Sequence, residues 1–138
     1  MAFVLDASIA LAWCFSDEST GYSKSILREL QRSEAVAPAV WQLEVCNALL
    51  VGERRRRLTA ERSQSFVRVL SELAITIDTE SASNGLALGA LARKHALSSY
   101  DASYVELAAR RRLPLATNDK RLRAAARKEG IGLAQPKH

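Results

Sequence analysis

The sequence predicts an α/β fold whose mainly parallel sheet is covered by helices on both faces. Short apolar stretches alternate along the chain with longer stretches whose apolar residues recur at helical spacing. A strand that is followed by a helix returns parallel to its predecessor, and a parallel sheet is buried on both faces. The sites of such sheets lie outside the carboxyl ends of the strands. Functional side chains are therefore expected where the predicted strands end.

The predicted strands are short pieces of apolar or β-branched residues that polar residues or proline bring to an end. Pro38 limits the second of them, and Asp78 bounds the third, whose Ile75 and Ile77 are β-branched. The expected strands cover 2–5, a piece from 36, 75–77, 113–117 and a piece near 132–134.

The predicted helices follow from residue spacing and capping. Ile26, Leu27 and Leu30 share one face of their segment, and Thr59 is an N-cap residue before a segment with apolar residues at helical spacing. Gly130 ends the last helix, which is basic. The expected helices cover 19–31, 40–56, the segment after 59, 83–95, 101–111 and 120–129.

Length and composition indicate one domain over 1–138, with 135–138 as a frayed tail. The 48% of hydrophobic and 25% of charged residues match an ordinary soluble protein. Apolar runs such as 9–15 are far shorter than the about 20 residues that a membrane span needs. No basic segment or cleavage pattern marks the first residues, so we expect no signal peptide, no membrane association and a cytoplasmic protein.

The cysteines and the interior histidine are expected to have structural roles only. Cys14 and Cys46 lie in apolar helical segments without metal-ligand spacing, which favours buried free thiols over a zinc site or a disulfide. His95 follows two basic residues at a helix end, where a surface position or pairing with the helix dipole is expected.

The positive charge is concentrated in the C-terminal part of the chain. Nine basic and two acidic residues lie from Arg110 onward, whereas residues 1–109 carry eleven basic and thirteen acidic ones. A second basic cluster covers 54–57. Such patches attract a polyanion through its phosphates, although a solvated helix face explains either cluster equally well. The candidates for nucleic-acid contact are Arg110, Arg111, Arg112, Arg121 and Arg123.

Four acids stand at informative places: two follow predicted strands, one interrupts an apolar helical segment and one opens a helix, namely Asp6 and Asp119, Glu44, and Asp101. Asp6 and Asp119 directly follow predicted strands, so one edge of the sheet presents both. Each acid alone has a structural explanation, because aspartate near a helix start caps the helix and Glu44 fits the solvent face of its helix.

Taken together, the four acids are typical of a magnesium-dependent nuclease. Convergent carboxylates repel one another unless protons or cations neutralise them, and hard oxygen ligands favour Mg²⁺ or Mn²⁺. Asn47 shares a helix face with Glu44 at i+3 spacing. Ser8 and Thr117 stand beside the strand-end acids and offer hydroxyls to the same site, although such residues are more often helix caps.

In this order and at this length, the chain resembles the PIN-domain nucleases, and among them the small VapC-type toxins of bacterial toxin–antitoxin pairs. The resemblance spans 2–134 and implies a three-layer α/β/α sandwich, a Mg²⁺-dependent endoribonuclease acting on RNA, and a homodimer. It rests on the segments 4–8, Glu44-Val45 with Asn47, Tyr100-Asp101-Ala102 with Tyr104, Leu107-Ala108, and Thr117-Asn118-Asp119. By position it makes Asp6, Glu44, Asp101 and Asp119 the catalytic, metal-site acids, and Ser8, Asn47 and Thr117 supporting residues.

The resemblance also implies a cognate antitoxin as a partner. The apolar segments 9–15 and 40–51 lie next to Asp6 and Glu44 in the sequence, so an amphipathic partner helix is expected to dock there while its basic side chain neutralises the acids. The aromatic side chains expected to be partly exposed in the free dimer are Trp13, Phe15 and Trp41.

Two alternatives to the toxin stay open: a PIN nuclease of RNA processing or DNA metabolism, and a non-catalytic nucleic-acid-binding domain. The compact chain favours the toxin, and a binding domain leaves the pairing of Glu44 with Asn47 unexplained. A phosphatase of the haloacid-dehalogenase type is disfavoured, because its second aspartate would stand at the position of Ser8.

Overall fold

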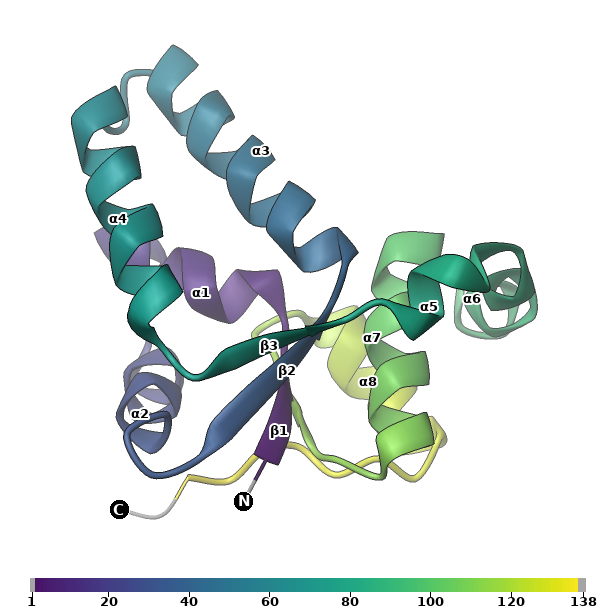
Figure 1. Cartoon of the computed structure of the whole chain (residues 1–138). Coiled ribbons are helices and arrows are strands. Elements are labelled where there is room, and N and C mark those ends of the chain that lie inside the picture. The colour runs from purple at the N-terminus through teal and green to yellow at the C-terminus, as the bar shows by residue number, and fades with distance from the viewer. Residues whose placement is uncertain (1, 137–138) are drawn as a thin grey trace.

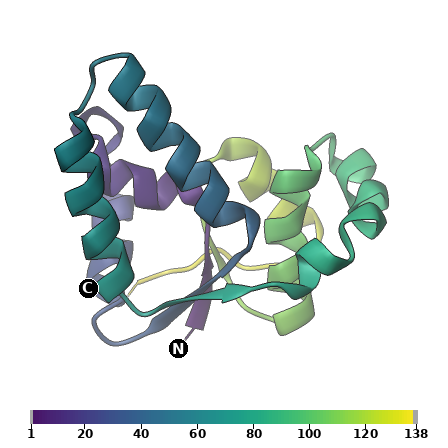
Figure 2. The same cartoon turned by 45° about the horizontal axis from the view of Figure 1, so that its top comes forward.

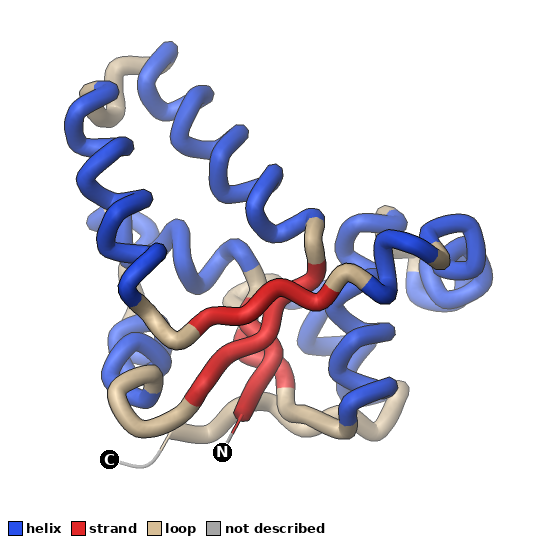
Figure 3. Tube along the Cα trace, in the orientation of Figure 1, coloured by secondary structure: helices blue, strands red, loops and turns tan. Residues whose placement is uncertain are grey.

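The computed structural model of the chain describes residues 2–136, and the part of the expected frayed tail at 137–138 lies outside them. Four strands form one all-parallel sheet in the order β3-β2-β1-β4. They are β1 (Ala2–Leu5), β2 (Glu34–Pro38), β3 (Ile75–Asp78) and β4 (Leu115–Ala116). The sheet lies at the centre of the molecule, as Figure 3 shows in red. The expectation of an α/β fold with a parallel sheet is confirmed.

The helices make the outer layers. Helices α1 and α2 lie on one side of the sheet, and α7 and α8 on the other, with α7 packed on β1 and β2 (Figure 1). Helices α3 and α4 form a hairpin that extends beyond the carboxyl ends of the strands, in both views (Figures 1 and 2). The α-helices are α1 (Ala7–Cys14), α2 (Gly21–Glu29), α3 (Val40–Arg54), α4 (Ala60–Glu72), α5 (Glu80–Ser83), α6 (Gly89–His95), α7 (Ser99–Arg111) and α8 (Lys120–Lys128); η1 (Ser16–Glu18) and η2 (Gly85–Leu88) are 3₁₀ turns.

Local chemistry explains where the central elements begin. Phe3, Val4 and Leu5 of β1 are fully buried, as expected for a strand that has neighbours on both sides. The Thr59 hydroxyl accepts a hydrogen bond from the Arg62 backbone N–H, so the predicted N-cap of α4 is confirmed. Within residues 2–136, no helix is long and apolar enough to cross a membrane.

Three predicted elements are shorter than the sequence pattern suggests. The helix expected at 83–95 is broken into α5, η2 and α6, because Asn84 leaves the helical conformation directly before Gly85, a weak helix former. The strand expected at 113–117 is reduced to β4, since Pro114 has no N–H to donate. The expected strand near 132–134 is a single bridge between Leu115 and Leu133.

Several burial predictions were wrong. Cys46 is exposed and Cys14 half-buried, so neither is the fully buried thiol that an apolar helix suggested. Trp13 is half-buried as expected, whereas Phe15 and Trp41 are buried in the core. The side chain of His95 is buried rather than at the surface, and its Nε2 lies 2.8 Å from the Glu129 carboxylate. The side chains of Phe15, Trp41 and His95 face neighbouring elements that a one-dimensional pattern does not reveal.

Candidate active site

The site lies where the sheet topology reverses direction. The chain passes from β1 to β2 and β3 on one side, whereas β4 pairs with the other side of β1. The carboxyl ends of β1 and β4 are therefore neighbours, and a crevice at such a switch point is the usual site of α/β sheets. The backbone N–H of Asp6 donates to the Ala116 carbonyl at 3.0 Å, which places Asp6 directly beside the segment that follows β4.

Asp6 is anchored by the two hydroxyls predicted to support it. Ser8 Oγ and Thr117 Oγ1 each donate to Asp6 Oδ2 at 2.6 Å, and Asp6 is only 4% exposed. The same hydroxyls accept hydrogen bonds from the backbone N–H groups of Asn118 and Asp119 at 3.1 and 3.0 Å. Both side-chain hydrogen bonds of Asp6 within the described residues end on Oδ2, so Oδ1 keeps its lone pairs for another ligand.

Glu44 is oriented by a tyrosine to which the sequence analysis gave no role. The Tyr104 hydroxyl on α7 donates to Glu44 Oε1 on α3 at 2.5 Å. Burial, followed by the charges of Asp6 and Glu44, raises the pKa of Tyr104, which keeps the hydroxyl a donor. Its i+3 spacing from Asp101 puts both residues on one face of α7, and this was the available signal.

The capping explanation holds for one of the three aspartates. Asp119 Oδ1 accepts hydrogen bonds from the Arg121 and Leu122 backbone N–H groups, so Asp119 caps α8. Asp6 precedes α1 without a side-chain capping bond. Asp101 lies inside the first turn of α7, where the Ser98 hydroxyl makes the cap. The carboxylate of Asp6 therefore needs another explanation, whereas Asp101 keeps the favourable place of an acid in the first turn of α7.

Electrostatics join the four acids into one group. Burial is the largest cause of a raised pKa at Asp6, Glu44 and Asp101. Asp101 and Asp119 raise the pKa of Asp6 further, Asp6 and Asp101 raise that of Glu44, and Asp119 raises that of Asp101. Such mutual repulsion is relieved by protons or by a cation.

The donor chemistry fits a hard divalent cation held partly through water. All the candidate ligands are oxygens, as Mg²⁺ prefers. Within residues 2–136, no three Asp, Glu, His or Cys side chains lie close enough to enclose a metal ion. This is compatible with Mg²⁺, because that ion keeps several waters and is commonly bound through one or two carboxylates. Asp101 is near enough to Asp6 for its charge to raise the pKa of Asp6.

The remaining predicted site residues lie elsewhere or have other partners. Asn47 is exposed on α3, and within residues 2–136 no hydrogen bond links it to the acids. Arg123 Nε donates to the Thr117 carbonyl at 2.8 Å, and its guanidinium stacks on Tyr22. Arg121 is exposed and near enough to lower the pKa of Asp101.

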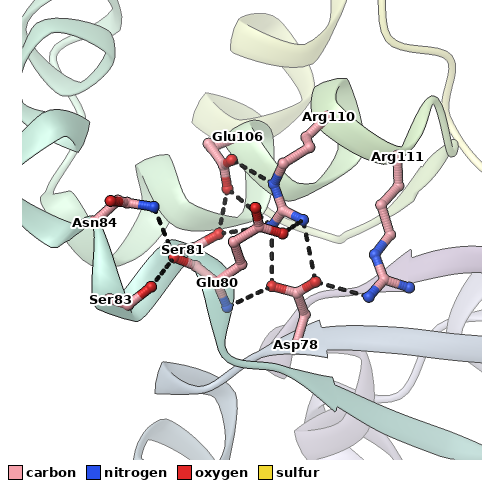
Figure 4. Close-up of polar contacts among 8 residues, drawn as sticks. All are labelled: Asp78, Glu80, Ser81, Ser83, Asn84, Glu106, Arg110 and Arg111. Carbon is pink, nitrogen blue, oxygen red and sulfur yellow. Dashed lines mark hydrogen bonds and ion pairs between the residues drawn. The ribbon is translucent and has the colours of Figure 1, made fainter.

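Arg110 and Arg111 belong to an ion-pair cluster between β3, α5 and α7 (Figure 4). The Arg110 guanidinium donates to Asp78, Glu80 and Glu106 at 2.7–2.9 Å, and Arg111 donates to Asp78 at 2.8 Å. The Ser81 hydroxyl also donates to Glu106. Arg110 thus pairs with carboxylates of its own chain. Its position in a basic run had instead suggested contact with a nucleic acid.

A PIN-domain family model matches residues 3–128, and the chain belongs to the PIN-domain family. PIN domains are in general nucleases. A comparison with curated proteins finds no match.

Solved structures share the fold over most of the chain. PAE2754 from Pyrobaculum aerophilum is 25% identical, with a TM-score of 0.66 over 91% of this chain and 87% of that chain. VapBC2 from Rickettsia felis, bound to a DNA fragment from their promoter, is 15% identical, with a TM-score of 0.67 over 97% and 98%. A toxin–antitoxin complex from Klebsiella pneumoniae is 19% identical, with a TM-score of 0.59 over 85% and 86%.

Proposed function

We propose that the chain is a Mg²⁺-dependent endoribonuclease that acts as the toxin of a type II toxin–antitoxin pair. The observation that carries the proposal is the buried Asp6 at the carboxyl ends of β1 and β4 of a PIN-domain sheet, held by Ser8 and Thr117. Asp101 is near enough to raise the pKa of Asp6, and both raise the pKa of Glu44, which Tyr104 orients. Fold neighbours described as VapBC2 and as a toxin–antitoxin complex support the biological role.

The acids and their supporting residues have distinct roles in this proposal. A bound Mg²⁺ would supply an activated water and neutralise charge during phosphodiester hydrolysis. Asp6, Glu44 and Asp101 would hold it, with Mn²⁺ as a substitute, and Asp119 would add negative charge while capping α8. Ser8 and Thr117 fix Asp6 through one oxygen and leave the other for the cation. Tyr104 fixes Glu44.

RNA binding is assigned to exposed basic residues that have no acid partner in the described chain. Arg121 lies in the first turn of α8, close enough to Asp101 to lower its pKa, and we propose it as a phosphate contact at the acids. We propose Arg112, the exposed C-cap of α7, as a second contact at the opposite end of that helix. Arg110, Arg111 and Arg123 already contact groups of their own chain, and we leave them out of this surface. Phosphate contacts do not read base sequence, so target choice depends on RNA shape and exposed bases.

A homodimer and a cytoplasmic location complete the proposal. The exposed apolar side chains Leu43, Leu86 and Tyr100 border one groove near the acids, and a second copy would remove them from water. The RNA substrate and the antitoxin are expected in the cytoplasm. Sedimentation of the purified chain tests the dimer.

The decisive experiment tests whether the chain cleaves RNA through its acids and whether it acts as a toxin. Asp6→Asn, Glu44→Gln and Asp101→Asn should each abolish RNA cleavage without loss of fold, whereas Asp119→Asn should keep its helix cap and lose less. Expressing the wild-type chain alone should arrest growth, and coexpressing the adjacent small gene should restore it. Harmless expression with intact RNA would favour a processing nuclease or a binding domain instead.

A further inference from the structure

The basic cluster at 54–57 lies at the turn between α3 and α4, which is the tip of the helical hairpin. In both views the tip is the part of the hairpin farthest from the sheet (Figures 1 and 2). Arg54, Arg55 and Arg56 are exposed there, and within residues 2–136 none of the three makes an ion pair. Three guanidinium groups without a countercharge therefore face solvent at one place.

The fourth arginine of the cluster, Arg57, fixes the turn to the rest of the fold. Its guanidinium lies over the Phe15 ring, 4.1 Å from the centroid. It also donates to Asp17 and Glu18 at 2.8 and 3.0 Å, so these acids are engaged by Arg57. The Arg57 backbone N–H donates to the Gly52 carbonyl at 2.8 Å, which closes the end of α3. The tip is thus an anchored turn that presents the other three arginines.

One face of α3 connects the tip to the candidate active site. Asn47, Val51 and Arg55 follow Glu44 at i+3, i+7 and i+11, which is the spacing of one helix face. Eleven residues of helix rise roughly 16 Å, about three turns. Asn47 is exposed along this path, between the acids and the tip. A strand held at Glu44 that follows this face of α3 reaches Arg55.

The acids nearest in sequence to the tip do not lie on this face. Glu53 is nine residues from Glu44, about two and a half turns, which puts it on the opposite side of α3. There it lines the apolar groove toward α4. Glu61 lies in the first turn of α4, where an acid complements the helix dipole. The side of the tip that continues from Glu44 is therefore positively charged.

We propose that Arg54, Arg55 and Arg56 bind backbone phosphates of the RNA that the acids cleave, several nucleotides away from the cut. The inference rests on the proposed function for the identity of this polyanion. Guanidinium groups suit phosphates because they donate two parallel hydrogen bonds. At a rise of about 3.4 Å per stacked nucleotide, roughly 16 Å corresponds to about five nucleotides. The preferred substrate is thus RNA that extends at least this far from the cut on one side.

The length of the RNA provides the test. The probes are fluorescein-labelled oligouridylates of about four and about twelve nucleotides, bound to the full chain in EDTA and followed by anisotropy. The wild type should bind the long probe about 20-fold more tightly than the short one. The triple variant Arg54→Gln, Arg55→Gln and Arg56→Gln should reduce this gain to about twofold. Its affinity for the long probe should also depend less on salt, with a log–log slope smaller by about 2, since three phosphate contacts are lost.

A second triple variant controls for net charge. Arg93, Arg127 and Lys128 are exposed on α6 and α8, and none makes an ion pair within the described chain. Changing all three to glutamine removes the same charge far from α3. This control should keep the gain of the long probe over the short one within about threefold of the wild-type gain.

Arg56 separates RNA binding from stability. Its φ of 59° is left-handed, at the helix-end position where glycine is favoured. Arg56→Gly should raise the melting temperature by about 2 °C, because the steric cost of the side chain disappears. The same variant should weaken binding of the long probe about threefold, which a purely structural turn would not do.

Three results would overturn the inference: an unchanged length gain in the tip variant, an equal loss in the control variant, or unchanged RNA binding by Arg56→Gly. If the tip variant binds RNA normally but loses the product of the adjacent small reading frame, the tip is instead a contact for a protein partner.

Cleavage of RNA by the wild type in Mg²⁺ separates this inference from the proposed function. If the wild type cleaves RNA and the tip variant keeps the length gain, the tip assignment alone fails. If the wild type cleaves no RNA while the tip variant loses the length gain, the nuclease proposal fails and the tip remains an RNA-binding surface.

Discussion

Arg110→Met should destabilise the chain by removing the centre of the ion-pair cluster between β3 and α7. Arg110, more than Arg111 and the Glu80 backbone N–H, lowers the pKa of the buried Asp78 from 3.8 to about 2. This difference corresponds to about 2.4 kcal/mol of stability at neutral pH. Since Arg111 and the backbone bond persist, we expect the free energy of unfolding to fall by about 1.5–2 kcal/mol. For a chain of this size, that lowers the melting temperature by roughly 5–8 °C.

Calorimetry with a matched variant tests this reasoning. Arg111 is more exposed and contacts Asp78 through one nitrogen, so Arg111→Met should cost less than about 1 kcal/mol. A carboxyl group whose pKa is lower in the folded than in the unfolded state stabilises the folded chain at any pH above its unfolded-state pKa. This stabilisation is lost as the pH falls through the folded-state pKa. The difference between wild type and Arg110→Met should therefore be full above about pH 4 and shrink toward pH 2. Equal melting temperatures, or an equal effect of Arg111→Met, would refute the magnitude assigned to Arg110.

Three further outcomes are expected. Tyr104→Phe removes the hydrogen bond that orients Glu44 and should lower the cleavage rate about 10–100-fold while the chain still melts cooperatively; unchanged kinetics would exclude a positioning role. The raised pKa values of the buried acids mean that the metal-free chain loses stability as pH rises above about 4 through those values, and millimolar Mg²⁺ should restore it at pH 7 in thermal melts. Neutralising Arg112 and Arg121 should flatten the salt dependence of RNA affinity, whereas Arg110→Met should leave the slope unchanged; the reverse result would return Arg110 to the RNA surface.

Much of the fold was predictable because it depends on local patterns. The apolar stretch 2–5, the cap Thr59 and the alternation of strands with helices each act within a few neighbouring residues. The broken helix at 83–95 and the short β4 depend on Asn84 and Pro114, whose effects override the apolar spacing around them.

The sequence indicated which residues are candidates for the site, but not which of them contact one another. Strand ends marked Asp6 and Thr117, and the structure brings them into contact. The i+3 spacing of Tyr104 from Asp101 indicates a shared helix face, but the contact of Tyr104 with Glu44, sixty residues away, is not encoded in any local pattern. The ion pairs of Arg110 were not predictable for the same reason, because Asp78 and Glu80 lie on β3 and α5, about thirty residues away in the sequence.

The central claim is that the clustered acids act through a bound divalent cation. The most direct test is the rate of RNA cleavage by the wild type and by Asp6→Asn, each stripped with excess EDTA and then resupplied with Mg²⁺. We predict no cleavage by the stripped wild type, full recovery with Mg²⁺, and a loss of about 100-fold or more for Asp6→Asn even with Mg²⁺. Wild-type cleavage that persists in EDTA, or Asp6→Asn cleavage at the wild-type rate, would contradict the assignment.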